Sequence, residues 1–148
     1  MSDPAAMEGA AHDQRTTISL LLHYPAHPAR TSDPHYVDFE AYRRKTHATA
    51  QCAFAVETGI SAECHGLLER HHSHIEFSLQ NGVDLGVLES VYPGIGDPTQ
   101  VGAWVESAAN LEWLCARHHR GFGGKHTAPY ADYEAEKFVR GLIAEGAV

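Results

Sequence analysis

NLEWLCARHH, residues 110–119, and LERHH, residues 68–72, are the two stretches that decide the predicted fold of this chain. Each combines apolar residues with a pair of adjacent histidines, and the longer stretch also holds a cysteine. Clusters of histidine and cysteine are typical of metal sites. Neither stretch is distinctive alone. Together they combine the histidine pair His71-His72 with an interval of nine residues from Asn110 to His119. This combination favours one functional unit over coincidence.

Together the two stretches resemble the HNH endonucleases, also called ββα-metal nucleases. In that family a His-His or Asp-His pair ends one strand, an Asn-Leu pair follows, and a last histidine comes at the interval seen here. HSHIEF at 72–77 and RGFGGKH at 120–126 add a similarity to small HNH proteins of actinobacterial phages. The resemblance covers roughly residues 52–140 and implies an α+β fold, in which a ββα-metal (HNH) core carries a structural zinc knuckle and flanking helices.

The resemblance also implies roles for individual residues. Hydrolysis of a phosphodiester needs a base that activates water, a cation that stabilises negative charge, and a rigid orientation of the base. The resemblance makes His72 the general base, a role that histidine can fill near neutral pH. His71 and His119 would hold one divalent ion, which is Mg²⁺, Mn²⁺ or Zn²⁺. Asn110 would fix the turn and the ring of His72, so the implied catalytic set is His72, Asn110 and His119.

The identity of the base stays open between two histidines. The segment from Ser73 can also be aligned with the His-Ile step of the family, which would make His74 the base. We favour His72, because the residue before it is His71, a good metal ligand, whereas the residue before His74 is Ser73, a poor one.

Three side chains are candidates for further roles at this site. If the first strand continues past His72, His74 and Glu76 lie on the same face as His72, in a supporting role. His126 follows the glycine-rich loop and could supply a third metal ligand or contact the scissile phosphate. An ordinary surface histidine is the alternative for His126.

The cysteines predict a second, structural metal site. Three cysteines are too few and too odd in number for a disulfide framework, so reduced thiols are available as ligands. Cys115 and His118 have the two-residue gap of a zinc knuckle, and Cys64 can join them from upstream. Cys52 completes a tetrahedral zinc site, with His65 as the alternative fourth ligand. Structural zinc would also stabilise a small domain with few apolar residues at its centre.

The composition fits one globular domain: 148 residues, 43% hydrophobic and 20% charged. The net charge of −8 argues against a protein that coats nucleic acid by bulk electrostatics, because such binding depends on lysine and arginine. No apolar run approaches the roughly 20 residues of a membrane-spanning helix, so no membrane partner is expected. Local basic groups are still candidate nucleic-acid contacts, and these are Arg43, Arg44 and Lys45 in one group and Arg117, Arg120 and Lys125 in the other.

The chain divides into a disordered segment at 1–16, a strand and helix extension at 17–51, and the nuclease domain at 52–148. Its patterns predict a strand at 17–22, a helix at 35–50, two short strands joined by a turn between 51 and 77, and helices at 83–91, 97–107 and 132–144. The predicted core residues are Trp104, Leu111, Trp113 and Leu114.

The resemblance implies an endonuclease that hydrolyses double-stranded DNA, and we expect nicking or weak sequence selectivity, since no separate recognition module is visible in the sequence. The resemblance implies 5′-phosphate and 3′-hydroxyl ends, and phage packaging or replication proteins as partners. We expect a monomer or homodimer in the cytoplasm, which is that of the host cell if a phage encodes the chain. The alternatives are a zinc-stabilised nucleic-acid-binding module without cleavage activity and a histidine-rich metal-binding protein with no nucleic-acid role.

Overall fold

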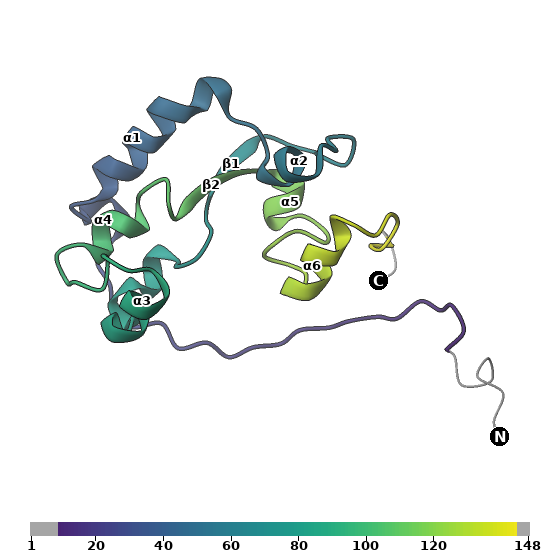
Figure 1. Cartoon of the computed structure of the whole chain (residues 1–148), viewed down its shortest axis with the longest axis horizontal. Helices are drawn as coiled ribbons and strands as arrows, with labels where there is room; N and C mark the ends of the chain where they lie inside the picture. Colours follow the sequence, from purple (N-terminus) through teal and green to yellow (C-terminus); the bar gives the residue numbers. More distant parts are fainter. Residues whose placement is uncertain (1–8, 145–148) are drawn as a thin grey trace.

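The computed structural model describes residues 9–144 and places short helices around a small sheet (Figure 1). This mixture of helices with an antiparallel sheet confirms the predicted α+β class. The elements, in chain order, are η2 (Arg30–Ser32), α1 (Tyr36–Thr46), η3 (His47–Thr49), α2 (Ala53–Thr58), β1 (Leu68–His72), η4 (Phe77–Gly82), α3 (Leu85–Val91), α4 (Val101–Val105), β2 (Leu111–Cys115), α5 (Ala116–Arg120) and α6 (Tyr130–Glu136). No helix within the described residues is long and apolar enough to cross a membrane.

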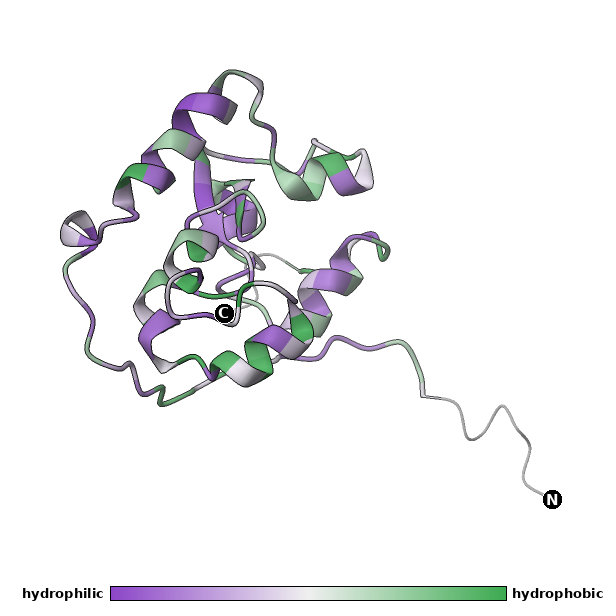
Figure 2. Ribbon diagram, turned by 60° about the vertical axis from the view of Figure 1, so that its left-hand side comes forward, coloured by the Kyte–Doolittle hydropathy of each residue, from purple (hydrophilic) through white to green (hydrophobic). Residues whose placement is uncertain are grey.

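The sheet pairs β1 with β2 in antiparallel register, with Leu68 opposite Cys115 and His72 opposite Leu111. β2 runs directly into α5, so this unit has the order strand, antiparallel strand, helix. β1 is hydrophilic over most of its length (purple in Figure 2), whereas β2 is largely buried and mostly apolar. Backbone pairing with β2 holds β1 in place, which leaves the side chains of β1 available for polar chemistry.

Two small hydrophobic clusters form the core. Phe54 of α2, Leu114 of β2 and Tyr133 of α6 pack together in the first, and Leu88 of α3 packs with Trp104 of α4 in the second. Burying a large apolar side chain of this kind contributes roughly 1.5–3 kcal/mol. The predicted core residues are all buried, namely Trp104, Leu111, Trp113 and Leu114.

The predicted hairpin between residues 51 and 77 is wrong. Its first half is the helix α2, which ends at Gly59 with a φ of 73°. A glycine in this left-handed conformation is a common helix C-cap, so Gly59 ends a helix and not the first strand of a hairpin. The partner of β1 is the strand at residues 111–115, far along the chain. The residues expected to form that partner belong to α2, whose buried Phe54 packs on Leu114 of β2 instead.

The predicted strand at 17–22 is also wrong. Residues 9–29 run as an extended segment along one side of the molecule (Figure 1) and form no helix or strand. The side chains of Leu20 and Leu21 are exposed, so this part of the segment buries no apolar surface that would hold a strand. Of the predicted disordered segment, residues 1–8 lie outside the described residues and 9–16 have no regular structure.

The remaining helix predictions differ mainly at their ends. The helix at 35–50 corresponds to α1 and η3, and the helix at 83–91 corresponds to α3, where Asp84 accepts the backbone N–H of Val87 at 3.0 Å as an N-cap. Asp97 caps a turn through the N–H of Thr99 instead of starting a helix, so α4 begins only at Val101. The last helix starts after Pro129 and ends before the predicted 132–144 is complete.

Candidate metal centres

Three cysteines and one histidine meet where α2, β2 and α5 come together. Cys52 is the N-cap of α2, Cys64 lies in the loop before β1, and Cys115 ends β2. His118 comes from α5 and is fully buried. The sulfur of Cys115 accepts the backbone N–H of His118 at 3.4 Å, so the turn from strand to helix itself places two of the four residues.

The distances in this Cys₃His centre fit a tetrahedral metal site. Nδ1 of His118 lies 3.6 Å from the sulfurs of Cys52 and Cys64 and 3.1 Å from the sulfur of Cys115. All four ligand atoms lie within 4.8 Å of one another. Tetrahedral zinc, with bonds of about 2.3 Å to sulfur and about 2.0 Å to nitrogen, would separate these atoms by about 3.5 Å. The group can therefore hold a metal ion such as zinc, whereas His65, the predicted alternative ligand, is exposed and outside it.

Protonation in the Cys₃His centre also fits a metal. Burial lowers the pKa of His118 to about 4, so the ring is neutral near pH 7, as a ligand must be. Burial and the neighbouring thiols of Cys52 and Cys115 raise the pKa of Cys64 to about 12. Burial also acts to raise the pKa of Cys115, but backbone N–H groups of His118 and His65 donate to its sulfur and lower it. Three adjacent thiols cannot all ionise without a compensating cation.

Two carboxylates lie on the other side of His118. A ring nitrogen of His118 and oxygens of Glu63 and Glu136 lie within 4.8 Å of one another. Nε2 of His118 and one oxygen of each glutamate are buried without a hydrogen-bond partner among the described residues. A metal-bound histidine usually directs its second N–H at a carboxylate, so Glu63 and Glu136 are placed to orient this ligand.

The second centre joins His71 of β1, His119 of α5 and His126 of the loop that follows α5. Nε2 of His126 lies 3.2 Å from Nδ1 of His71 and 3.1 Å from Nε2 of His119. One ring nitrogen carries either a proton or a lone pair and cannot make a good hydrogen bond to both neighbours. Two nitrogens bound tetrahedrally at about 2.0 Å would lie about 3.3 Å apart. The three rings are therefore placed as ligands of one ion, with His126 as the third.

This three-histidine centre is open on one side. Burial is the main cause that lowers the pKa of His71, to about 3, and it also lowers the pKa of His126, so both rings are neutral near pH 7. The His71 side chain is 6% exposed, whereas that of His126 is 42% exposed. Three protein ligands with an accessible remaining position are typical of catalytic metal sites.

Carboxylates back two of the three histidines. Glu69 accepts a hydrogen bond from Nδ1 of His119 at 2.9 Å, and an oxygen of Glu112 lies 4.0 Å from Nε2 of His71. A hydrogen bond from Arg120, with a further one from His119, lowers the pKa of Glu69 to about 2, so this carboxylate is ionised. A carboxylate that accepts a hydrogen bond, as Glu69 does, fixes the ring orientation and the tautomer of a metal-binding histidine, whereas Glu112 only adjoins His71.

The predicted nucleic-acid contacts fall into two groups. Arg43, Arg44 and Lys45 are exposed on α1. The second group forms ion pairs with glutamates that adjoin the two centres, so its charge is neutralised within the chain. These pairs are Arg117 with Glu136 at 2.5 Å, Arg120 with Glu69 at 2.8 Å, and Lys125 with Glu112 at 2.6 Å.

His72 points to the other face of β1 from His71, as adjacent residues of a strand do. Its ring stacks on Phe39 of α1, with centroids 5.7 Å apart and planes at 8°. Nε2 of His72 lies 3.2 and 3.3 Å from the two oxygens of Glu106. Nδ1 of His72 lies 3.9 Å from one oxygen of Glu76. The other oxygen of Glu76 lies 3.9 Å from Nε2 of His126, a ligand of the three-histidine centre. Glu76 therefore lies between the predicted base and that centre.

Asn110 is fully buried and fixes backbone rather than a ring. Its Oδ1 accepts the N–H groups of His74 and Ile75 at 2.9 and 3.0 Å, and its Nδ2 donates to the carbonyls of Ile75 and Val105 at 2.8 and 2.9 Å. Four bonds use the whole capacity of the amide. Asn110 thus fixes the turn, as predicted, but it does not reach the ring of His72 as predicted.

His74, the alternative base, lies outside the three-histidine centre. β1 ends at His72, so His74 does not continue its face. Nδ1 of His74 lies 3.0 Å from the hydroxyl of Tyr92, and its ring stacks on Trp104. Its surroundings belong to α3 and α4 rather than to the metal ligands.

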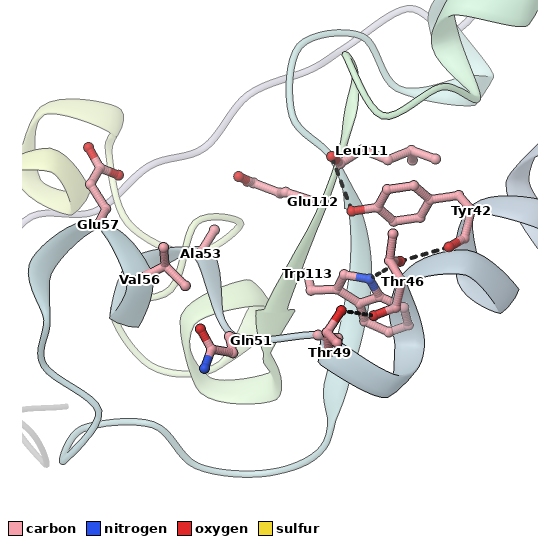
Figure 3. A pocket seen from close by; sticks show the side chains of 11 residues that line it. Tyr42, Thr46, Thr49, Gln51, Ala53, Val56, Glu57, Leu111, Glu112 and Trp113 are labelled. Carbon is pink, nitrogen blue, oxygen red and sulfur yellow. Dashed lines mark hydrogen bonds between the residues drawn. The ribbon is translucent and has the colours of Figure 1, made fainter.

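A separate groove of about 370 Å³ lies between α1, α2 and β2 (Figure 3). In it the indole N–H of Trp113 donates to Thr46 at 2.7 Å, and the hydroxyl of Tyr42 donates to the carbonyl of Leu111 at 3.4 Å. No ligand residue of either metal centre lines this groove.

The sequence reasoning did not identify the carboxylates Glu69, Glu112 and Glu106. Glu69 lies two residues before His71 and so on its face, and Glu112 lies opposite His71 in the strand register. Strand alternation could have found Glu69, whereas Glu112 depends on a strand pairing that the sequence did not predict. Glu106 follows α4 and meets His72 only through the tertiary fold.

No family model, curated protein or solved structure matches this chain. The HNH resemblance of its motifs therefore remains a prediction, and a functional proposal rests on the geometry of the two centres.

Proposed function

We propose that this chain is a metal-dependent, HNH-type endonuclease that hydrolyses phosphodiester bonds of double-stranded DNA. The observation that carries the proposal is the convergence of His71, His119 and His126 at nitrogen separations of 3.1–3.2 Å on a strand, strand, helix unit. His72, the proposed base, is the next residue on the same strand. Glu69 accepts a hydrogen bond from the His119 ring, which matches the supporting carboxylate expected of a metal site.

The chain's residues divide the chemistry between them. A divalent ion held by His71, His119 and His126 would stabilise negative charge on the phosphate and the leaving oxygen. His72 takes a proton from water, and the water oxygen forms the new bond to phosphorus while the bond to the 3′ oxygen breaks. The 3′ oxygen takes a proton from solvent, which leaves 5′-phosphate and 3′-hydroxyl ends. The exposed side chains of 43–45 on α1 provide phosphate contacts.

The Cys₃His centre has a structural role in this proposal, with zinc as its metal. Three of its ligands, Cys52, Cys115 and His118, are buried, and Phe54 stacks on His118 at 3.9 Å. A closed centre with sulfur ligands suits zinc and leaves no position for substrate. Zinc would tie α2, β2 and α5 together beside the small first core cluster.

A plasmid-nicking assay tests the proposal. Supercoiled plasmid is incubated at low salt with Mg²⁺ or Mn²⁺ and either the wild-type chain, His72→Ala or His23→Ala. The last is a matched control, because His23 is an exposed histidine in the extended segment. We expect His72→Ala to lose roughly 10²–10⁴-fold in nicking rate, the usual contribution of a general base, and His23→Ala to retain it.

Two outcomes contradict the proposal. Equal nicking by the wild-type chain and His72→Ala would remove the proposed base. Binding of the plasmid with no metal-dependent nicking by the wild-type chain would instead identify the chain as a zinc-stabilised nucleic-acid-binding module.

A further inference from the structure

Glu106 is a buried carboxylate whose position the chemistry described so far does not explain. Its side chain is 1% exposed, and it lies where α4 ends. One oxygen lies 3.0 Å from a guanidinium nitrogen of Arg30, and its two oxygens lie 3.2 and 3.3 Å from Nε2 of His72. A buried carboxylate is costly unless it is paired and hydrogen-bonded, so the contacts with Arg30 and His72 stabilise Glu106 in its buried position.

The contact fixes which nitrogen of His72 carries the proton. An ionised carboxylate can only accept hydrogen bonds, so the nitrogen that faces Glu106 must be the donor. Arg30 also approaches Nε2, at 3.5 Å, and as a donor it would favour a lone pair there. The carboxylate is closer, since its two oxygens lie 3.2 and 3.3 Å from Nε2 whereas the guanidinium nitrogen lies 3.5 Å away. Glu106 therefore determines the tautomer of His72, and the proton of the neutral ring lies on Nε2.

The remaining nitrogen of His72 faces Glu76, which adjoins the three-histidine centre. Nδ1 lies 3.9 Å from Glu76, which also approaches His126 at 3.9 Å. Phe39 stacks on the ring and opposes a flip that would exchange the two nitrogens. The charged groups that face this ring are Arg30 and Glu106 on the Nε2 side and Glu76 on the Nδ1 side.

We propose that Glu106 is the positioning residue of the reaction, holding the ring proton on Nε2 of His72 so that the lone pair on Nδ1 accepts the proton of the attacking water. This inference rests on the proposed function, because it assigns an atom to the base of that reaction. The arrangement of a buried carboxylate, an oriented histidine and an attacking oxygen uses the logic of a serine protease triad.

The tautomer of His72 tests this inference without any activity measurement. Long-range proton–nitrogen NMR spectra of the full zinc-loaded chain distinguish a protonated ring nitrogen from one with a lone pair. We expect a proton on Nε2 of His72 in the wild-type chain. In Glu106→Gln the side-chain amide can donate to Nε2, which would move the proton to Nδ1. Glu106→Asp keeps a carboxylate and should keep the Nε2 proton.

The nicking assay supplies the second readout. We expect Glu106→Gln to lower kcat by up to roughly 10⁴-fold with little change in KM, the loss that the wrong tautomer causes in a protease triad, and Glu106→Asp to recover part of the rate. Glu57→Gln is the control, since Glu57 is an exposed glutamate paired with Lys137. Far-ultraviolet circular dichroism and the zinc content of each variant show that it is folded.

The outcomes separate this inference from the proposed function. A proton on Nδ1 in the wild-type chain, or an Nε2 proton retained in folded Glu106→Gln, would overturn the positioning role. Full nicking activity of Glu106→Gln would overturn it as well. If the wild-type chain shows the Nε2 tautomer but never nicks DNA with any divalent ion, the proposed function fails while the assigned tautomer stands.

Discussion

Replacing Asn110 with alanine should destabilise the fold more than any other single amide substitution within the described residues. The side chain is fully buried and makes four hydrogen bonds to backbone groups of His74, Ile75 and Val105. Each buried polar group left without a partner costs about 1 kcal/mol or more, so Asn110→Ala should lose about 4 kcal/mol of unfolding free energy. Native domains are stable by only about 5–15 kcal/mol. Much of the margin should therefore disappear.

Urea unfolding followed by tryptophan fluorescence measures this loss, because Trp104 and Trp113 are buried in the folded chain. Asn81→Ala is the matched control: its amide is exposed and donates one hydrogen bond, to the carbonyl of Ala26 at 2.9 Å. We expect Asn81→Ala to cost less than about 1 kcal/mol. If Asn110→Ala is no more destabilising than Asn81→Ala, Asn110 does not fix the turn that follows β1 at His74 and Ile75.

Three further predictions concern the metal centres. Cys115→Ser should remove tightly bound zinc and lower the unfolding temperature, whereas His65→Ala should keep one zinc per chain by atomic absorption; zinc retained by the serine variant would refute the Cys₃His assignment. Glu69→Gln should weaken Mn²⁺ binding at the three-histidine centre by roughly 10–100-fold in calorimetry, since it removes the carboxylate that accepts a hydrogen bond from His119. Unchanged affinity would show that this hydrogen bond does not contribute to metal binding. In the metal-free chain, His71 and His118 have folded pKa values of about 3 and about 4, below the ordinary value of 6.5. The unfolded state then binds more protons, so stability should fall as the pH drops from about 6.5 toward 4, and a flat profile of urea midpoints over that range would contradict the buried, neutral rings.

The metal ligands were predictable because their residue types carry the chemistry. Cys115 and His118 lie one helical turn apart, and the pairing of a cysteine and histidine at this spacing needs little knowledge of the fold. The choice of Cys52 over His65 was not decided by the sequence. It depends on α2, whose Phe54 packs on β2 and brings the N-cap of that helix to the centre.

The strand pairing was less predictable. β1 reads LERHH, which has no apolar alternation, so its partner cannot be found from periodicity. The buried, mostly apolar β2 decides the sheet through contacts that are distant in the sequence. The extended segment around Leu20 has the residue types of a strand, but it pairs with neither strand of the sheet and its leucines are exposed, so composition alone was misleading there.

The ends of nicked DNA test the central claim most directly. Plasmid nicked by the zinc-loaded wild-type chain with Mn²⁺ is treated with DNA ligase, in parallel with plasmid exposed to His119→Ala. Hydrolysis as proposed leaves 5′-phosphate and 3′-hydroxyl ends, so ligase alone should reseal the wild-type nicks, and His119→Ala should produce none. Nicks that cannot be resealed, or equal nicking by His119→Ala, would contradict a hydrolytic reaction at the three-histidine centre.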